Sequence, residues 1–151
     1  MQSGLFIIGD GTPAHAGVNF SVSGGSSYVD ATSGVTLYFA ANAGTLKVTG
    51  DGLNLNAPTG GLYDGIAVWK PNYTAATSEN VSWTGGNINI NGVIDMPYAN
   101  LTYTGGTTQV NQTIIVDTFK LTGGNIGGPA TSKFLTGVGT GSSSGGTYMV
   151  E

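Results

Sequence analysis

Val81-Ser82-Trp83-Thr84-Gly85-Gly86 is a segment of alternating apolar and hydroxyl residues that ends in a glycine pair, and related segments recur along the chain. Apolar residues at every second position predict a β-strand with one buried face and one solvated face. The glycines after it predict a corner. The copies begin 26, 35, 20 and 18 residues apart. They occupy residues 20–25, 46–51, 81–86, 101–106 and 119–124.

A second family of short apolar strands precedes each of the last four copies. Its members are residues 35–39, 66–69, 93–96 and 113–116. A spacing of about 20 residues with longer excursions is typical of coils that stack on one another. Two further stretches, 53–56 and 87–91, alternate Asn with Leu or Ile. We expect their Asn side chains on the outer or corner face, where they form hydrogen-bonded ladders from coil to coil.

These patterns predict an all-β chain, most simply a right-handed parallel β-helix, a single-stranded solenoid that forms one domain over residues 1–151. At roughly 20–25 residues per coil, the chain has about six or seven coils. An antiparallel β-sandwich is the alternative, because its strands also recur every 8–12 residues or so. We expect loop excursions near 57–65 and 70–80, and a segment rich in Gly, Ser and Thr at 127–147.

Composition narrows the function classes. Gly, Thr, Ser and Asn supply 71 of 151 residues, and only 8% are charged, against about 25% in a typical soluble domain. A net charge of −4 without a basic cluster argues against nucleic acid and anionic membrane partners. The chain has no Cys, which excludes disulfides and thiolate metal sites. This composition is typical of secreted and cell-surface proteins, so we expect an extracellular location.

The chain start also points to β-structure. Met1-Gln2-Ser3-Gly4-Leu5-Phe6-Ile7-Ile8 has no charged region before its short apolar run, so it predicts a strand and not a signal peptide. No run of about 18 apolar residues occurs, which predicts no membrane insertion. We expect the chain to be a module of a longer secreted protein.

Catalytic and metal chemistry have little support in the sequence. His15 is the one histidine, and the six Asp residues are scattered without a paired motif. A transition-metal site or a nucleophilic triad needs a cluster of such side chains. Polysaccharide lyases of this fold need a cationic base, and the chain has no Arg. We therefore expect a non-enzymatic protein without catalytic residues, metal or cofactor.

A carbohydrate-binding or polysaccharide-cleaving module is the alternative from another functional class. Tyr63 and Tyr73 lie in the excursions and are candidates for exposed stacking surfaces. Trp69 follows the apolar alternation, which favours a core position, but an outward ring would join the same surface. Asp95 and Asp117 occupy comparable places in the second strand family. Stacked on one face about one coil apart, two carboxylates would suit acid–base work or calcium binding. Two solvated outward side chains are the interpretation that we favour.

Several stretches, in order, resemble the C-terminal β-helical region of secreted bacterial proteins that accompany tight-adherence (Flp-type) pilus assembly. The resemblance covers about residues 34–126, and the ending Val150-Glu151 also fits. It is carried by Gly34-Val35-Thr36-Leu37-Tyr38-Phe39, Leu53-Asn54-Leu55-Asn56-Ala57-Pro58-Thr59, Tyr63-Asp64-Gly65-Ile66-Ala67-Val68-Trp69, the Thr84-Gly85-Gly86 corner, Gly92-Val93-Ile94-Asp95-Met96-Pro97 and Leu101-Thr102-Tyr103-Thr104-Gly105-Gly106.

The resemblance implies an envelope or extracellular location and a structural or adhesive role, with no assigned catalytic residues. Pilus or other cell-surface proteins and glycans are the partners that it suggests. The full-length proteins of this family usually carry an N-terminal membrane anchor, a segment that this sequence does not show.

The two ends of the predicted solenoid are candidate contact sites. An open β-helix leaves an unpaired strand edge at each end, and a low charge removes the repulsion that opposes association. We expect homo-oligomers or head-to-tail filaments, weakened by deletion of residues 146–151. The expected contact residues are Leu5, Phe6, Ile7 and Ile8 in the first strand and Tyr148, Met149 and Val150 in the last.

Overall fold

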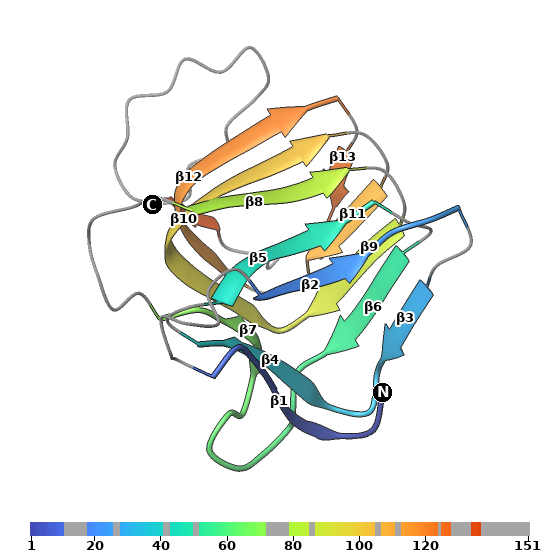
Figure 1. The fold of residues 1–151 in the computed structure, drawn as a ribbon, viewed down its shortest axis with the longest axis vertical. Helices are drawn as coiled ribbons and strands as arrows, with labels where there is room; N and C mark the ends of the chain where they lie inside the picture. Colours follow the sequence, from blue (N-terminus) through green and yellow to red (C-terminus); the bar gives the residue numbers. More distant parts are fainter. Residues whose placement is uncertain are drawn as a thin grey trace.

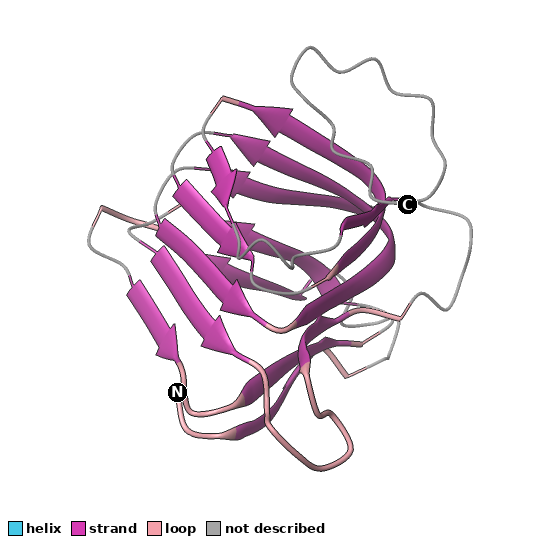
Figure 2. Ribbon diagram, turned by 180° about the vertical axis from the view of Figure 1, so that it is seen from behind, coloured by secondary structure: helices cyan, strands magenta, loops and turns pink. Residues whose placement is uncertain are grey.

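A computed structural model describes eleven stretches of the chain. They are residues 1–10, 18–25, 28–40, 43–49, 52–71, 79–84, 87–104, 107–110, 113–123, 125–127 and 134–136. Every regular element in these stretches is a β-strand, and none of them contains a helix (Figure 2). The strands lie in three ladders, and each passage of the chain adds one strand to each ladder.

Two of the ladders form one nine-stranded sheet. The first contains β1 (Gly4–Ile8), β4 (Val35–Phe39), β7 (Ile66–Trp69), the first halves of β10 (Val93–Thr104) and β12 (Ile114–Thr122), and β14 (Phe134–Thr136). The second contains β2 (Val18–Val22), β5 (Ala43–Val48), β8 (Glu79–Thr84) and the second halves of β10 and β12. Because β10 and β12 are long and bent, they connect the two ladders (Figure 1).

The third ladder is a separate five-stranded sheet. Its strands are β3 (Tyr28–Ala31), β6 (Gly52–Asn56), β9 (Asn87–Asn91), β11 (Thr107–Val110) and β13 (Asn125–Gly127). One passage through the three ladders is called a coil here. The described residues contain five full coils and, in β14, the first strand of a sixth.

The spacing of the sequence copies is the spacing of paired strands. Corresponding positions of successive copies pair as Phe20 with Leu46, Lys47 with Ser82, Val81 with Leu101, and Leu101 with Phe119. The second strand family behaves alike, since Leu37 pairs with Val68. Every strand pairing in the described ranges is parallel. The antiparallel sandwich is therefore wrong, and the all-β, parallel prediction is confirmed.

The core is a stack of inward side chains that continue from coil to coil. In the second ladder, Val48, Trp83 and Tyr103 are register partners, and none of the three is exposed. Trp83 is thus a core residue, as the alternation predicts. In the first ladder, Leu37 and Val68 form the corresponding buried column. Apolar burial along such columns is the main stabilising contribution to the fold.

Polar ladders run along the outer face. The Nδ2 of Asn89 donates a hydrogen bond to Oδ1 of Asn54 at 2.9 Å. On the second ladder, Nδ2 of Asn100 donates to Oδ1 of Asn80 at 3.4 Å, and the Thr118 hydroxyl donates to Oδ1 of Asn100 at 2.5 Å. The predicted coil-to-coil hydrogen bonding of Asn side chains is confirmed between Asn54 and Asn89. The bonds on the second ladder were not predicted from the sequence.

The predicted excursions fall between strands. Residues 57–65 form the loop from β6 to β7. The second excursion ends earlier than expected because Glu79 already begins β8, and its residues 72–78 lie outside the described part. Within the segment 127–147, Gly127 ends β13 and Phe134–Thr136 form β14, while the remaining positions are not described.

Gly92 lies at the corner between β9 and β10, where it packs against Ala57 of loop 57–65 and Ala67 of β7. Its φ is +147°, and a Cβ built on it would lie 2.5 Å from the Ala57 Cβ and 2.9 Å from the Ala67 Cβ. Gly61 in the exposed loop also has a positive φ, +86°, but nothing lies within 4 Å of the place of its Cβ. An alanine at Gly92 would meet both backbone strain and close packing, whereas an alanine at Gly61 would meet backbone strain alone.

We predict that Gly92→Ala lowers the free energy of unfolding by about 3 kcal/mol, because backbone strain and overpacking add. Gly61→Ala carries the strain alone and costs about 1 kcal/mol. Urea denaturation of both variants measures the difference. Equal losses would mean that the corner at Gly92 is not closely packed.

Candidate functional site

The first coil forms one end of the stack of described coils. Within the described residues, β1, β2 and β3 each pair with one strand only, namely β4, β5 and β6. Three inward side chains of this coil, Phe6, Phe20 and Val29, pack against the core but stay partly exposed. The Met1 amino group donates a hydrogen bond to the carbonyl oxygen of Asp30, which draws the chain start towards β3. An apolar core end beside three strand edges is a surface suited to association.

The four residues predicted in β1 divide between the two faces of the strand. Leu5 and Ile7 point outward and are 37% and 62% exposed. Ile8 points inward and is buried, and Phe6 shares its face. The structure therefore brings these side chains to the free edge, with Phe6 facing the open core. Tyr148, Met149 and Val150 lie outside the described residues.

The opposite end of the second ladder also presents inward apolar side chains. The second half of β12 pairs with β10 and has no further partner in the described part of the chain. Leu121 continues the inward column of Trp83 and Tyr103, yet it is 47% exposed. Phe119 is partly buried. At both ends of this ladder, inward side chains are partly or fully exposed at positions whose equivalents in the middle coils are buried in the core.

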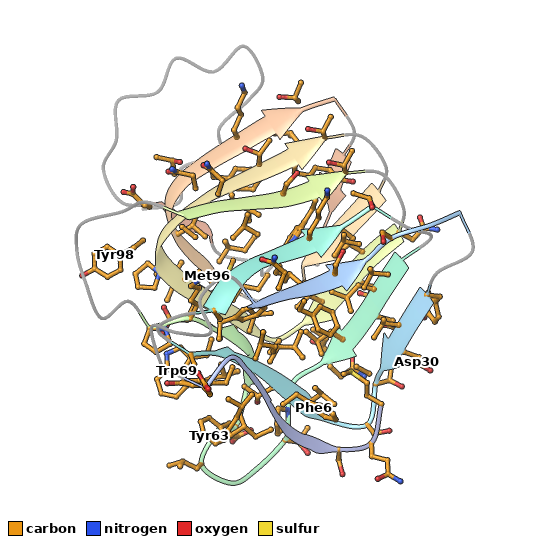
Figure 3. All side chains as sticks on the ribbon, viewed as in Figure 1. Phe6, Asp30, Tyr63, Trp69, Met96 and Tyr98 are labelled. Atoms are coloured by element: carbon orange, nitrogen blue, oxygen red, sulfur yellow. The ribbon has the colours of Figure 1, made fainter. Side chains whose placement is uncertain are left out.

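An aromatic cluster of Tyr38, Tyr63 and Trp69 covers the outer face of the first ladder. The ring centroids of Tyr38 and Trp69 are 5.3 Å apart in an edge-to-face arrangement, and those of Tyr63 and Trp69 are 5.8 Å apart. Figure 3 shows Tyr63 and Trp69 close together on one side of the ribbon. Loop 57–65 supplies Tyr63, and strands β4 and β7 supply the other two rings.

The favoured core position of Trp69 is wrong. Trp69 pairs with the outward Tyr38, while the preceding Val68 is fully buried, so the Trp69 ring points outward and is partly exposed. The register between β7 and β10 shifts after Val93, so the outer column continues from Trp69 to Asp95. Sequence alternation alone does not reveal such a shift.

Asp95 and Asp117 are not register partners. Asp95 pairs with Trp69 on one side and Ile115 on the other. The register shifts between Met96 and Asn100, where β10 contains more residues than the facing part of β12, and Asp117 lies exposed at this corner. Burial raises the pKa of Asp95 above its usual value.

The remaining aromatic residues divide between the surface and the core. Tyr73 lies outside the described residues. Tyr98 projects from the corner of β10 and is 46% exposed, apart from the cluster (Figure 3). Tyr103 is fully buried in the core. Of the aromatic side chains predicted to contact glycans, the structure therefore brings Tyr63 and Trp69 together.

A groove of about 650 Å³ lies between β1 and loop 57–65. Leu5 lines its β1 side, Tyr63 lines its loop side, and the buried Thr36 forms part of its floor. The Thr36 hydroxyl donates to the carbonyl oxygen of Ile66 at 2.7 Å, which fixes it in place. Sequence reasoning missed this groove, although the Pro and Gly residues of the excursion signalled the loop that forms it.

Lys70 is a buried cation that the sequence pattern did not single out. It follows β7, and its Nζ donates a hydrogen bond to the carbonyl oxygen of Ala43 at 2.9 Å. The Nζ also lies 5.9 Å from the ring centroid of Phe39, at the limit of a cation–π contact. Burial penalises the charged form and lowers the pKa of Lys70 to about 8.

This pKa predicts a pH-dependent stability. Between pH 8 and 10.5 the unfolded chain holds more protons than the folded one, because 10.5 is the ordinary pKa of the group, so stability rises with pH in that window. We expect a rise of up to about 3 kcal/mol from this group. Lys70→Met removes the rise. Parallel urea titrations at pH 7.5 and 10.5 test this, and equal pH slopes for the two proteins would contradict it.

No three His, Cys, Asp or Glu side chains gather within the described residues. The same part of the chain contains no helix of the length and apolarity needed to cross a membrane. Comparison with known protein families, with curated proteins and with solved structures finds no match to this chain.

Proposed function

We propose that this protein is a right-handed parallel β-helix that acts as a non-enzymatic, extracellular structural or adhesion module and associates head to tail with further copies. One observation carries the proposal: the first coil has three parallel strands with a single described partner each, over the partly exposed Phe6, Phe20 and Val29. The resemblance to pilus-associated secreted proteins supports the same role and location.

A second copy is the occupant that fits this end. Because all strands are parallel, β2 of one copy placed beside β12 of another continues the second ladder in the same direction. Phe20 and Phe119 belong to the same inward column, so this docking adds Phe20 of one copy to the column that ends at Phe119 of the other. A head-to-tail contact of this kind does not close on itself and generates a filament.

The low charge of the chain favours the same outcome. Only 8% of residues are charged, and the net charge is −4, so little repulsion opposes contact between copies. On the second ladder, the inward end side chains are uncharged: Phe20 and Phe119 are partly exposed, and Leu121 is exposed. Burying them in a neighbouring copy removes apolar surface from water, at roughly 25 cal/mol per Å².

Charge placed at either end tests the proposal. We predict that Leu121→Glu and Phe20→Lys each weaken association at least about tenfold, because an unpaired charge is then buried in the contact. Sedimentation velocity and negative-stain electron microscopy across a concentration series measure the effect. The matched controls are Thr122→Glu and Ser21→Lys, which place the same charges next door on the exposed outer face.

A double variant makes the test specific for head-to-tail contact. Phe20→Lys combined with Phe119→Glu puts opposite charges into the same inward column at every contact, and we expect it to associate more tightly than Phe20→Lys alone. A wild-type protein that stays monomeric at all concentrations would reject self-association. Equal effects of Leu121→Glu and Thr122→Glu would reject the proposed contact surface.

A further inference from the structure

The groove beside β1 is built from uncharged side chains. Its described lining holds no acidic, basic or histidine side chain, and its polar groups are hydroxyls, amides and backbone. Five of the polar lining residues are Ser3, Ser33, Asn56, Thr59 and Asn91. A charged ligand in such a groove loses hydration without an opposite charge to compensate it. This chemistry disfavours phosphate, metal ions and charged peptide ends, and it suits a neutral ligand rich in hydroxyl groups.

Most of these polar groups are available to a ligand. Nδ2 of Asn56 donates to the carbonyl oxygen of Thr32 at 3.2 Å, which orients its amide. The side chains of Ser3, Ser33, Thr59 and Asn91 make no hydrogen bond within the described residues and are exposed. Hydroxyls and amides each donate and accept, so together they match the alternating donors and acceptors of a sugar ring.

Tyr63 adds an aromatic surface to this polar lining. It lines the groove while its ring packs on Trp69 at a centroid distance of 5.8 Å. Aromatic rings offer a flat apolar face with a polar tip, and the C–H face of a sugar stacks on such a surface. Exposed Leu62, next to it in the lining, extends the apolar side.

The loop that carries Tyr63 is held in place before any ligand binds. The amide of Gly65 donates to the carbonyl oxygen of Pro58 at 2.9 Å, and the amide of Ile66 donates to that of Tyr63 at 3.1 Å. On the floor, a Cβ built on Gly34 would lie 3.4 Å from the Pro58 Cα, so the loop base sits against the corner before β4. A preformed groove loses less conformational entropy on binding than a mobile one.

We infer that this groove binds a neutral oligosaccharide, with Tyr63 as the stacking surface and Asn56, Asn91 and the surrounding hydroxyls as hydrogen-bonding groups. Its volume of about 650 Å³ lies within the range of about 300–1,000 Å³ that is common for small-molecule sites. The groove shares Leu5 with the β1 edge, but its lining contains none of Phe6, Phe20 and Val29 of the open core end, so neutral-sugar binding goes beyond the proposed self-association.

The experiment titrates dilute protein with two neutral probes, maltoheptaose and chitohexaose, and with an acidic probe, pentagalacturonate. Isothermal calorimetry measures the affinity. Tryptophan emission reports whether the probe binds beside Tyr63, because Trp69 contacts Tyr63 whereas Trp83 is fully buried. We expect saturable binding of at least one neutral probe with a shift in emission, and no binding of the acidic one. Trp69→Phe assigns the shift.

Three variants decide whether Tyr63 forms the site. Tyr63→Ala weakens binding about tenfold or more, and Tyr63→Phe keeps most of the affinity because the stacking face remains. Tyr98→Ala is the matched control, since it removes an exposed tyrosine outside the groove. Circular dichroism checks the fold of each variant.

The inference is overturned when neither neutral probe gives heat of binding, when the acidic probe binds as well as the neutral ones, or when Tyr63→Ala and Tyr98→Ala have equal affinities. Sedimentation of the same samples keeps this result separate from self-association. If the groove binds no probe, the protein can still associate with a concentration dependence that sedimentation measures. If the protein stays monomeric, it can still bind the probe, and calorimetry detects this.

Discussion

Parallel pairing between successive coils is the constraint on which the rest of this structure depends. Each strand takes its hydrogen-bonding partners from the coils before and after it, so the inward side chains must repeat in register. The column of Val48, Trp83 and Tyr103 shows the result, with large apolar side chains stacked in a narrow core. The same rule leaves the strands of the first coil with one described partner each. The association that we propose therefore uses the same parallel pairing as folding.

The number of residues per coil is not fixed by the parallel pairing of the strands. Loop 57–65 and the excursion that begins at Lys70 lengthen the third coil without changing which residues pair, because loop closure costs little for added residues. Lys47 still pairs with Ser82 across 35 positions, as Ser82 does with Thr102 across 20. Loops of this kind tolerate changes in sequence and often carry binding residues. The aromatic cluster and the groove both arise where loop 57–65 folds over the first ladder.

The sequence predicts the ladders well because the strand copies have few alternatives for pairing: their spacing equals the observed register. It predicts the outer surface less well. Alternation assigns two faces to a strand, but a shift of one residue exchanges them. A shift of this kind occurs after Val93, beside the outward Trp69. Asp95 pairs with Ile115, two positions before Asp117, although the two aspartates occupy similar places in their strands. The groove escaped prediction because it joins residues 3–5 with residues 56–63, and no local pattern connects them.

Hydrogen–deuterium exchange at two protein concentrations tests the central claim most directly, because it reads the free strand edges themselves. At low concentration, amides of β1, β2 and β3 should exchange faster than those of β7, β8 and β9, which have partners on both sides. At high concentration, protection should rise in β2 and in the second half of β12 and stay constant in β8. Protection of the first coil that is already complete at low concentration, or that never depends on concentration, would contradict the account.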